Sequence, residues 1–435
     1  MNECIKRVCK DLKMIPESSS LVANILLKRI QAEKSKFEEL YADLDILEEN
    51  ITEKGYYFPS LEKPLRENFE QFKPKIEDFA NIPINAILKV IKNESEWRTA
   101  LLQKFTTEIP NELRETYVKL FENVYFVSPS NELEKLIHQD PIKFSISART
   151  LHSDIGFLNE MSGFCCNRSI FIYEGGMRKE TLANCARYLD EGKSLRETIK
   201  TALRFEAGFV LNLVVHELAH AQVPELYEKD VELKKEILLK EEDFYHELTS
   251  NEMNMLINKI NPQFANLADL EKVLTITIAV LPVNVSELPK PDAAHAYAYA
   301  YPFQETKSKG LKLPTRAENL REEITTLVER RSVLGALIEG YSAFVSECLL
   351  NADKNFRFFK QERDRNLKKI QGPSAIKREV TGARYGSDLI QQLYQKYGTK
   401  GLRIVLKSPP ETYNELTDLS SYTNKISLSQ YLSFL

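Results

Sequence analysis

Residues 203–224 read LRFEAGFVLNLVVHELAHAQVP, and this stretch indicates the centre of the fold. From Ala207 to Val215 almost every side chain is apolar, which predicts a helix buried on all sides. Pro224 predicts where that helix ends. Because buried ionisable groups are costly without partners, polar residues at the end of such a helix need a physical reason. The polar residues that follow the apolar run are His216, Glu217 and His220.

A bound metal ion is one such reason. Residues four apart lie on one face of a helix, so the imidazoles of His216 and His220 can point at the same ion. Zinc takes neutral imidazole ligands at about 2.0–2.1 Å and, in catalytic sites, keeps one position for water. Glu217 would stand beside the ion without binding it, as the general base for that water. The alternative is a helix whose polar face reaches solvent after Val215.

A catalytic zinc site needs a third protein ligand. A third histidine six residues after the second, as in metzincins, is excluded because residue 226 is leucine. The other histidines lack supporting context; they are His138, His152, His246 and His295. The candidate carboxylates are Glu241, Glu242, Glu247, Glu252 and Glu339. Glu252 follows an asparagine, as in thermolysin-like sites, but its charged surroundings favour a solvated surface position.

Glu339 is the favoured third ligand because of its neighbours. Residues Glu318–Leu350 show one long helical pattern, and Glu339 lies near the side opposite its apolar face. Small residues let a second helix approach closely, whereas a solvated glutamate usually has charged neighbours. The small residues on that side are Ser332, Gly335, Ala336, Ser342, Ala343 and Ser346. A surface glutamate on a small-residue face is the alternative.

The composition bounds the class of protein. The chain has 435 residues, 43% of them hydrophobic, with a formal charge of −4, which is typical of a folded globular protein. The near-neutral charge excludes nucleic-acid binding by bulk charge, and the basic stretch Lys354–Arg384 is interpreted as a solvated face. We therefore expect no nucleic-acid partner.

The same sequence predicts a cytoplasmic location. No apolar run approaches the roughly 20 residues that a bilayer requires. The N-terminus lacks the apolar segment of a secretory signal, although export by a non-cleaved signal stays open. Six cysteines are scattered without a Cys-x-x-Cys pair, which indicates reduced thiols. The adjacent Cys165 and Cys166 are interpreted as buried small side chains.

The predicted fold class is mainly α with a small β-sheet. Helical patterns cover Leu21–Leu47, Trp97–Phe105, Leu113–Phe121, Glu318–Leu350 and, with breaks, the region from Lys179 to about residue 260. The predicted strands are Val124–Val127, Phe144–Ala148 and Ser169–Tyr173.

Three regions are expected along the chain. Residues 1–120 form a helical N-terminal region. Residues 121–350 form the catalytic region, with a long helical insertion at about 225–320. Residues 351–435 form a helical C-terminal region that packs on the catalytic region.

These motifs together resemble the gluzincin metallopeptidases. The segment His216-Glu-Leu-Ala-His220 is an HExxH motif, and Glu339-Gly-Tyr-Ser-Ala343 is similar to the Glu-Gly-x-Ala helix that carries the third ligand in such enzymes. Tyr385-Gly386 and Pro409-Pro410 echo the tail of uncharacterised zincin-like families. The resemblance covers about residues 165–415. The 119 residues from His220 to Glu339 (339 − 220) exceed the few tens usual in this class, so an inserted subdomain is expected.

The resemblance implies a zinc-dependent peptidase with one Zn²⁺ per chain and a zinc-bound water activated by Glu217. Its substrate would be a peptide or protein, paired with the strand residues Ile170, Phe171, Ile172 and Tyr173. An ordinary core strand is the alternative there. Tyr385 and His295 are the favoured donors to the developing oxyanion, among several tyrosines and Arg384. The rival functions are an inactive zincin-derived binding or scaffold protein and an exported toxin-like protease. Oligomeric state stays open.

Overall fold

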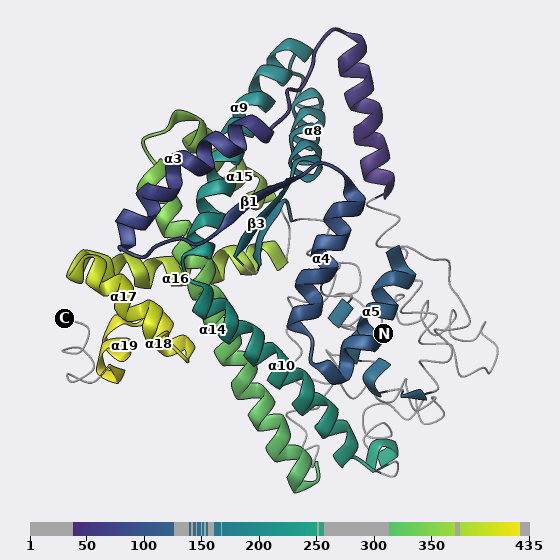
Figure 1. Cartoon of the computed structure of the whole chain (residues 1–435), viewed down its shortest axis with the longest axis vertical. Helices are drawn as coiled ribbons and strands as arrows, with labels where there is room; N and C mark the ends of the chain where they lie inside the picture. Colours follow the sequence, from purple (N-terminus) through teal and green to yellow (C-terminus); the bar gives the residue numbers. More distant parts are fainter. Residues whose placement is uncertain are drawn as a thin grey trace. The chain divides into compact units, whose positions relative to one another are not determined.

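The computed structural model describes residues 38–125, 139–140, 142–144, 146–148, 150–151, 154, 161–166, 168–249, 252–255, 313–369 and 375–426. Helices dominate these ranges, with one small sheet, so the predicted fold class is confirmed (Figure 1). The chain divides into two compact units. One comprises Met1–Lys36, Phe105–Leu158 and Lys234–Val328, and the other comprises Phe37–Lys104, Asn159–Leu233 and Glu329–Leu435. We call them unit 1 and unit 2.

Unit 2 contains the sheet. Strand β1 (Ile87–Ile91) pairs in parallel with β3 (Ser169–Tyr173), and β2 (Gly163–Cys166) pairs antiparallel with β3. The strand order is therefore β1-β3-β2, with β3 in the middle. Ile170 and Ile172 of β3 are fully buried, which explains the β-branched run at this position.

Helix α9 (Leu195–Ala221) is the central helix of unit 2. Ser194 begins it through a capping box, in which the Ser194 hydroxyl accepts from the Glu197 amide and the Glu197 carboxylate accepts from the Ser194 backbone. Helices α3 (Glu62–Ala80), α8 (Glu174–Asp190) and α15 (Lys354–Lys369) pack against it (Figure 1). The apolar run from Ala207 to Val215 is thus covered from several sides, as the sequence predicts.

The remaining helices of unit 2 follow in the C-terminal part of the chain. They are α16 (Ala375–Tyr397), α17 (Thr399–Lys407), α18 (Tyr413–Thr417) and α19 (Leu419–Lys425). Helix α14 (Thr315–Leu350) passes from unit 1 into unit 2. One hydrophobic core joins α3, α9, α14 and α16.

The crossing of α14 and α16 brings the two backbones into contact. A Cβ atom at Gly340 would overlap the amide nitrogen of Ser387, and one at Gly386 would overlap the carbonyl of Ala336. The close approach involves Gly340 and, of the small residues named from the sequence, Ala336, whereas Gly335 has no atom within 4 Å of its Cβ position. The predicted apolar face of α14 is buried at Leu334, Ile338, Tyr341 and Val345, but Cys348 is exposed.

Unit 1 includes α5 (Asn111–Tyr125) and parts of α4 (Glu94–Glu108) and α10 (Pro224–Glu247). Its buried polar centre is Lys234, whose ammonium lies 2.8 Å from Glu108 and 3.3 Å from Asp154. The hydroxyl of Tyr117 donates to the other Asp154 oxygen at 2.6 Å. Each buried charge in this cluster thus has a partner of opposite sign.

Two predicted strands are wrong. Val124 and Tyr125 end helix α5, and residues 144 and 146–148 are helical. Their aromatic and β-branched composition favours strands locally, but burial of Phe144 and Ile146 in a helical setting outweighs that preference. Conversely, β1 and β2 are not predicted from the sequence. The predicted boundaries of the three regions stay a prediction.

Among the described residues, α14 alone has the length and apolar composition of a membrane span. Yet 67% of its most apolar window is buried within the protein, which is also how a core helix would behave.

Candidate metal centre

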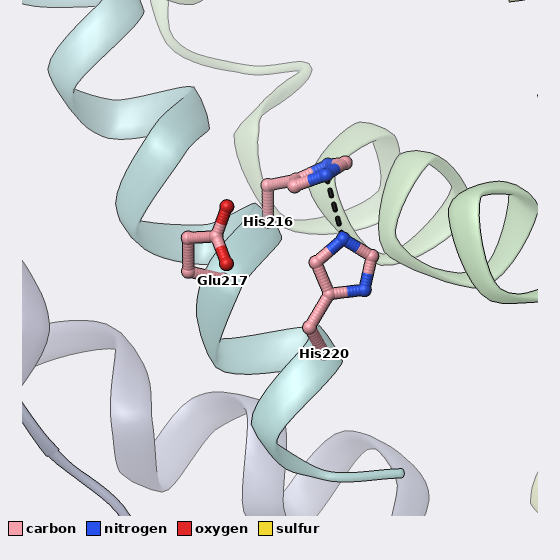
Figure 2. Close-up of side chains that lie close together, drawn as sticks. All are labelled: His216, Glu217 and His220. Atoms are coloured by element: carbon pink, nitrogen blue, oxygen red, sulfur yellow. Dashed lines mark hydrogen bonds between the residues drawn. The ribbon is translucent and has the colours of Figure 1, made fainter. Parts of the chain in front are cut away.

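The two histidines of α9 meet at their ring nitrogens. The Nε2 atoms of His216 and His220 lie 2.8 Å apart, and the rings stand nearly perpendicular, at 86°. Figure 2 shows both rings on one side of α9, with the Glu217 carboxylate beside them. Two Nε2 atoms this close repel each other through their lone pairs unless one carries a proton or a cation lies between them.

The third side chain comes from α14. One Glu339 oxygen lies 3.3 Å from Nε2 of His216, and the other lies 3.5 Å from Nε2 of His220. The structure thus brings together the three side chains that the sequence proposes as ligands. Glu339 thus lies close to both imidazoles, while its role as a zinc ligand stays a prediction.

This donor set fits a zinc ion. Ligand atoms around a tetrahedral zinc with bonds of about 2.0–2.1 Å lie roughly 3.3–3.4 Å apart. The separations here are 2.8, 3.3 and 3.5 Å, so small side-chain rotations would create that geometry. Two imidazoles and one carboxylate are also the ligand types of catalytic zinc sites.

The centre is enclosed on one side and open on the other. The side chain of His220 is 4% exposed, whereas those of His216 and Glu339 are 24% and 33% exposed. Water and a substrate group can therefore reach the point between the ligands from the His216 and Glu339 side.

Glu217 is buried beside the histidines. Its carboxylate and the two imidazoles have ligand-type atoms within 4.8 Å of one another. Glu217 is 4% exposed, and its Oε2 atom has no hydrogen-bond partner among the described residues. Burial raises the pKa of Glu217 to about 7, with the charge of His216 opposing this rise. A buried carboxylate beside the two imidazoles, with one oxygen unpartnered, is placed to accept a hydrogen bond from a water molecule held between the ligands.

Among the other groups of the centre, the pKa values of His220 and Glu339 are lowered and that of His216 is raised. Burial, reinforced by His216, lowers the pKa of His220 to about 3, so this imidazole is neutral. Burial alone would raise the pKa of Glu339, but the two imidazoles outweigh it and lower that pKa to about 2. A neutral imidazole and an ionised carboxylate are the forms that bind metal. Burial lowers the pKa of His216, but the hydrogen bond and charge of Glu339, together with the charge of Glu217, raise it above its usual value.

The competing carboxylates have other partners, all within unit 1. Glu242 lies 3.6 Å from the Lys143 ammonium and 3.7 Å from His246, and Glu247 pairs with Arg316 at 2.9 Å. Glu252 accepts from the Thr249 amide at 2.8 Å and caps a short helical segment. Glu241 is buried, 3% exposed.

Among the described residues, no contact joins a predicted oxyanion donor to His216 or His220. His295 lies outside the described residues, as do His138 and His152. Tyr385 is 44% exposed on α16, next to Gly386, which contacts α14 one turn before Glu339. Its role therefore stays a prediction.

The predicted substrate strand needs a correction. Ile170, Phe171, Ile172 and Tyr173 belong to β3, and both backbone edges of β3 are already paired with β1 and β2. A central strand has no free edge for another chain, so a peptide cannot add to β3. The strand next to Glu217 is β2, because a Cβ atom at Gly163 would lie 3.5 Å from Cγ of Glu217.

One residue of the centre is not predicted from the sequence. The ring of Tyr227, on α10, stands edge-on to the His220 ring, with 5.3 Å between centroids and an angle of 89°. Burial, together with the negative charges of Glu339 and Glu217, raises the pKa of Tyr227 well above its usual value. Its hydroxyl thus stays protonated. Since Pro224 starts a new helix, the sequence gives no sign of where Tyr227 points.

In comparisons with protein-family models, curated proteins and solved structures, nothing matches this chain. The resemblance to gluzincins therefore depends on the residues described above.

Proposed function

We propose that this chain is a zinc-dependent peptidase whose metal is held by His216, His220 and Glu339. One observation carries the proposal. Side chains from two helices, 119 residues apart in sequence (339 − 220), place two imidazole nitrogens and two carboxylate oxygens around a single point. A buried glutamate with a raised pKa lies beside that point.

The reaction is hydrolysis of an amide bond. Zinc, when bound, would polarise the scissile carbonyl and lower the pKa of the attacking water. Glu217 takes one proton from that water as its oxygen forms a bond to the carbonyl carbon. When the C–N bond breaks, Glu217 returns the proton to the leaving nitrogen, so that an acid and an amine are released. The intact Glu217 favours an enzyme over a zincin-derived scaffold protein.

Strand β2 is the proposed place for the substrate backbone. It is one of the two outer strands of the described sheet, and its Gly163 lies against Glu217 without a side chain between them. An extended peptide added to the outer edge of β2 would pass along the proposed base. The sheet thus keeps the role expected from the sequence, but through a different strand.

Tyr227 is the proposed donor to the oxyanion. It is a protonated hydroxyl group carried by a ring that contacts a ligand ring. Peptide hydrolysis gains about 3–4 kcal/mol of transition-state stabilisation from one such donor. Tyr385 is the alternative that the sequence favours.

The first test is metal content. Elemental analysis of the purified chain should find about one zinc per molecule, and His216→Ala or His220→Ala should lose it. Full metal content in both variants would show that these histidines do not hold the ion.

The second test separates binding from chemistry. Glu217→Gln should keep zinc but slow the digestion of a peptide library at least about a hundredfold, because the base is lost. Glu206→Gln is the matched control, since Glu206 is also a buried glutamate of α9, 3% exposed, and pairs with Arg178 away from the histidines. A fully active Glu217→Gln variant would refute the proposed mechanism.

A further inference from the structure

A buried hydrogen bond joins the two helices that carry the proposed ligands. The hydroxyl of Tyr341, on α14, donates to Oε1 of Gln222 at 2.5 Å, and Gln222 caps the C-terminus of α9. Tyr341 stands two residues after Glu339, and Gln222 stands two residues after His220. On each helix, therefore, the residue that makes this bond is two positions away from a proposed ligand.

The amide of Gln222 is fixed from its other side as well. Its Nε2 atom donates to the carbonyl of Ile76 at 3.0 Å and to that of Ile82 at 2.7 Å. Both hydrogens of the amide nitrogen are therefore used. If the amide flipped, it would lose its hydrogen bonds to the carbonyls of Ile76, in α3, and Ile82, just after it. As a result Oε1 has to face Tyr341.

Neither residue has access to water that could replace a lost bond. Gln222 is 2% exposed and Tyr341 is 0% exposed. Loss of the Tyr341 hydroxyl would leave the Gln222 oxygen buried without its partner, which favours a shift of α9 relative to α14. A shift of more than about 0.5 Å would matter, because metal ligands have to be held within about that distance of their binding geometry.

We propose that Tyr341 and Gln222 are positioning residues of the metal centre, and that their hydrogen bond sets the separation of His220 from Glu339. The inference depends on the proposed zinc site, but not on the peptidase reaction. It assigns to this pair a role beyond the stability of the core. Neither residue is a proposed ligand, so both would act by holding the two helices that carry the ligands.

The test uses Tyr341→Phe, which removes one oxygen atom and keeps the ring. Tyr422→Phe is the matched control. Tyr422 is also 0% exposed in unit 2, and its hydroxyl, on α19, donates to the carbonyl of Ser408 at the end of α17 at 2.6 Å. Both variants lose a hydrogen bond made by the hydroxyl of a buried tyrosine, but only Tyr341→Phe removes a bond between the two helices that carry the proposed ligands.

Two quantities are measured on the full chain: the zinc affinity, by competition with a chelator, and the visible absorption of the cobalt-substituted protein. Tyr341→Phe should weaken zinc binding about tenfold, the size typical of lost support around metal ligands, and change the cobalt spectrum. Tyr422→Phe should bind zinc within about twofold of wild type, even if its thermal stability falls as far as that of Tyr341→Phe.

Gln222→Met, which removes all three bonds at similar volume, should have a larger effect than Tyr341→Phe if it folds. The proposal is overturned if Tyr341→Phe binds zinc as tightly as wild type with an unchanged cobalt spectrum, or if Tyr422→Phe loses affinity equally. A wild-type protein that binds zinc but cleaves no peptide would refute the peptidase and leave this inference intact. A wild-type protein that binds no zinc would refute both.

Discussion

Glu339 and His216 are 123 positions apart in the sequence (339 − 216), yet a carboxylate oxygen of the first lies 3.3 Å from Nε2 of the second. This contact joins the middle of α14 to the end of α9. It is the relationship on which the proposed metal centre depends, because His216 and His220 alone could be a polar end of a core helix.

Glu339→Gln should weaken zinc binding by more than about a hundredfold. The charged ligand is lost, and even residues that only support metal ligands are worth about ten- to a hundredfold in affinity. Chelator competition measures the effect. Glu347→Gln is the control on the same helix, since Glu347 is 51% exposed and pairs with Lys360 at the surface. Equal affinities for Glu339→Gln and wild type would exclude Glu339 as a ligand.

Tyr227→Phe should lower kcat about a hundredfold and change KM only a few-fold, because an oxyanion donor acts mainly in the transition state. Steady-state kinetics on a cleaved peptide measure both constants. Tyr385→Phe is the comparison, since it removes the hydroxyl that the sequence favours. A loss of kcat in Tyr385→Phe alone would reassign the donor.

Two glycines of α14 should respond oppositely to alanine. Gly340→Ala should destabilise the fold by about 3 kcal/mol or more, since its Cβ would overlap the backbone of α16 at Ser387. Gly335→Ala, one turn earlier and without any atom near its Cβ, should stabilise the helix by about 0.5–1 kcal/mol. Urea unfolding of both variants measures the difference. Similar effects at the two positions would contradict the close helix crossing.

Arg178→Met should cost more stability at pH 8 than at pH 5. Burial raises the folded-state pKa of Glu206 above its usual value of 4.5, while Arg178, 2.8 Å away, opposes the rise. The stability contribution of a group with a raised pKa is present below the unfolded pKa and is lost as the pH rises through the folded pKa. Without Arg178 this loss grows, to about 3 kcal/mol or more at pH 8, because the buried ionised carboxylate no longer has a cation beside it.

Denaturation of metal-free wild type and Arg178→Met at both pH values measures this effect. The bond from Arg178 to the Pro59 carbonyl is lost at either pH, so it does not contribute to the difference. A loss of stability that is equal at pH 5 and pH 8 would show that Glu206 does not titrate as described.

The parts of the fold that local pattern controls were predictable. The strand Ser169–Tyr173 has the predicted bounds, and the helix with His216 and His220 is buried as its apolar run indicates. The small residues near Glu339 predicted a close helix approach, and α16 does contact α14, but at Ala336 and at Gly340, which the prediction did not include.

The rest of the fold and of the candidate site depends on contacts between segments that are far apart in the sequence. The pairing of β1 with β3 joins residues about 80 positions apart, and no local signal gives the strand order that places β3 in the middle. For the same reason the sequence assigned substrate pairing to β3, whose two edges are already paired with β1 and β2. Tyr227 was missed because the direction of α10 after Pro224 is set by packing.

The most direct measurement is anomalous diffraction at the zinc absorption edge, from crystals of the wild-type chain grown with zinc. We expect one strong peak between Nε2 of His216, Nε2 of His220 and a Glu339 oxygen, about 2.0–2.2 Å from each. Glu217 should lie beside the ion without binding it. A peak coordinated by Glu217 instead of Glu339, or no peak between the two histidines, would contradict the proposed centre.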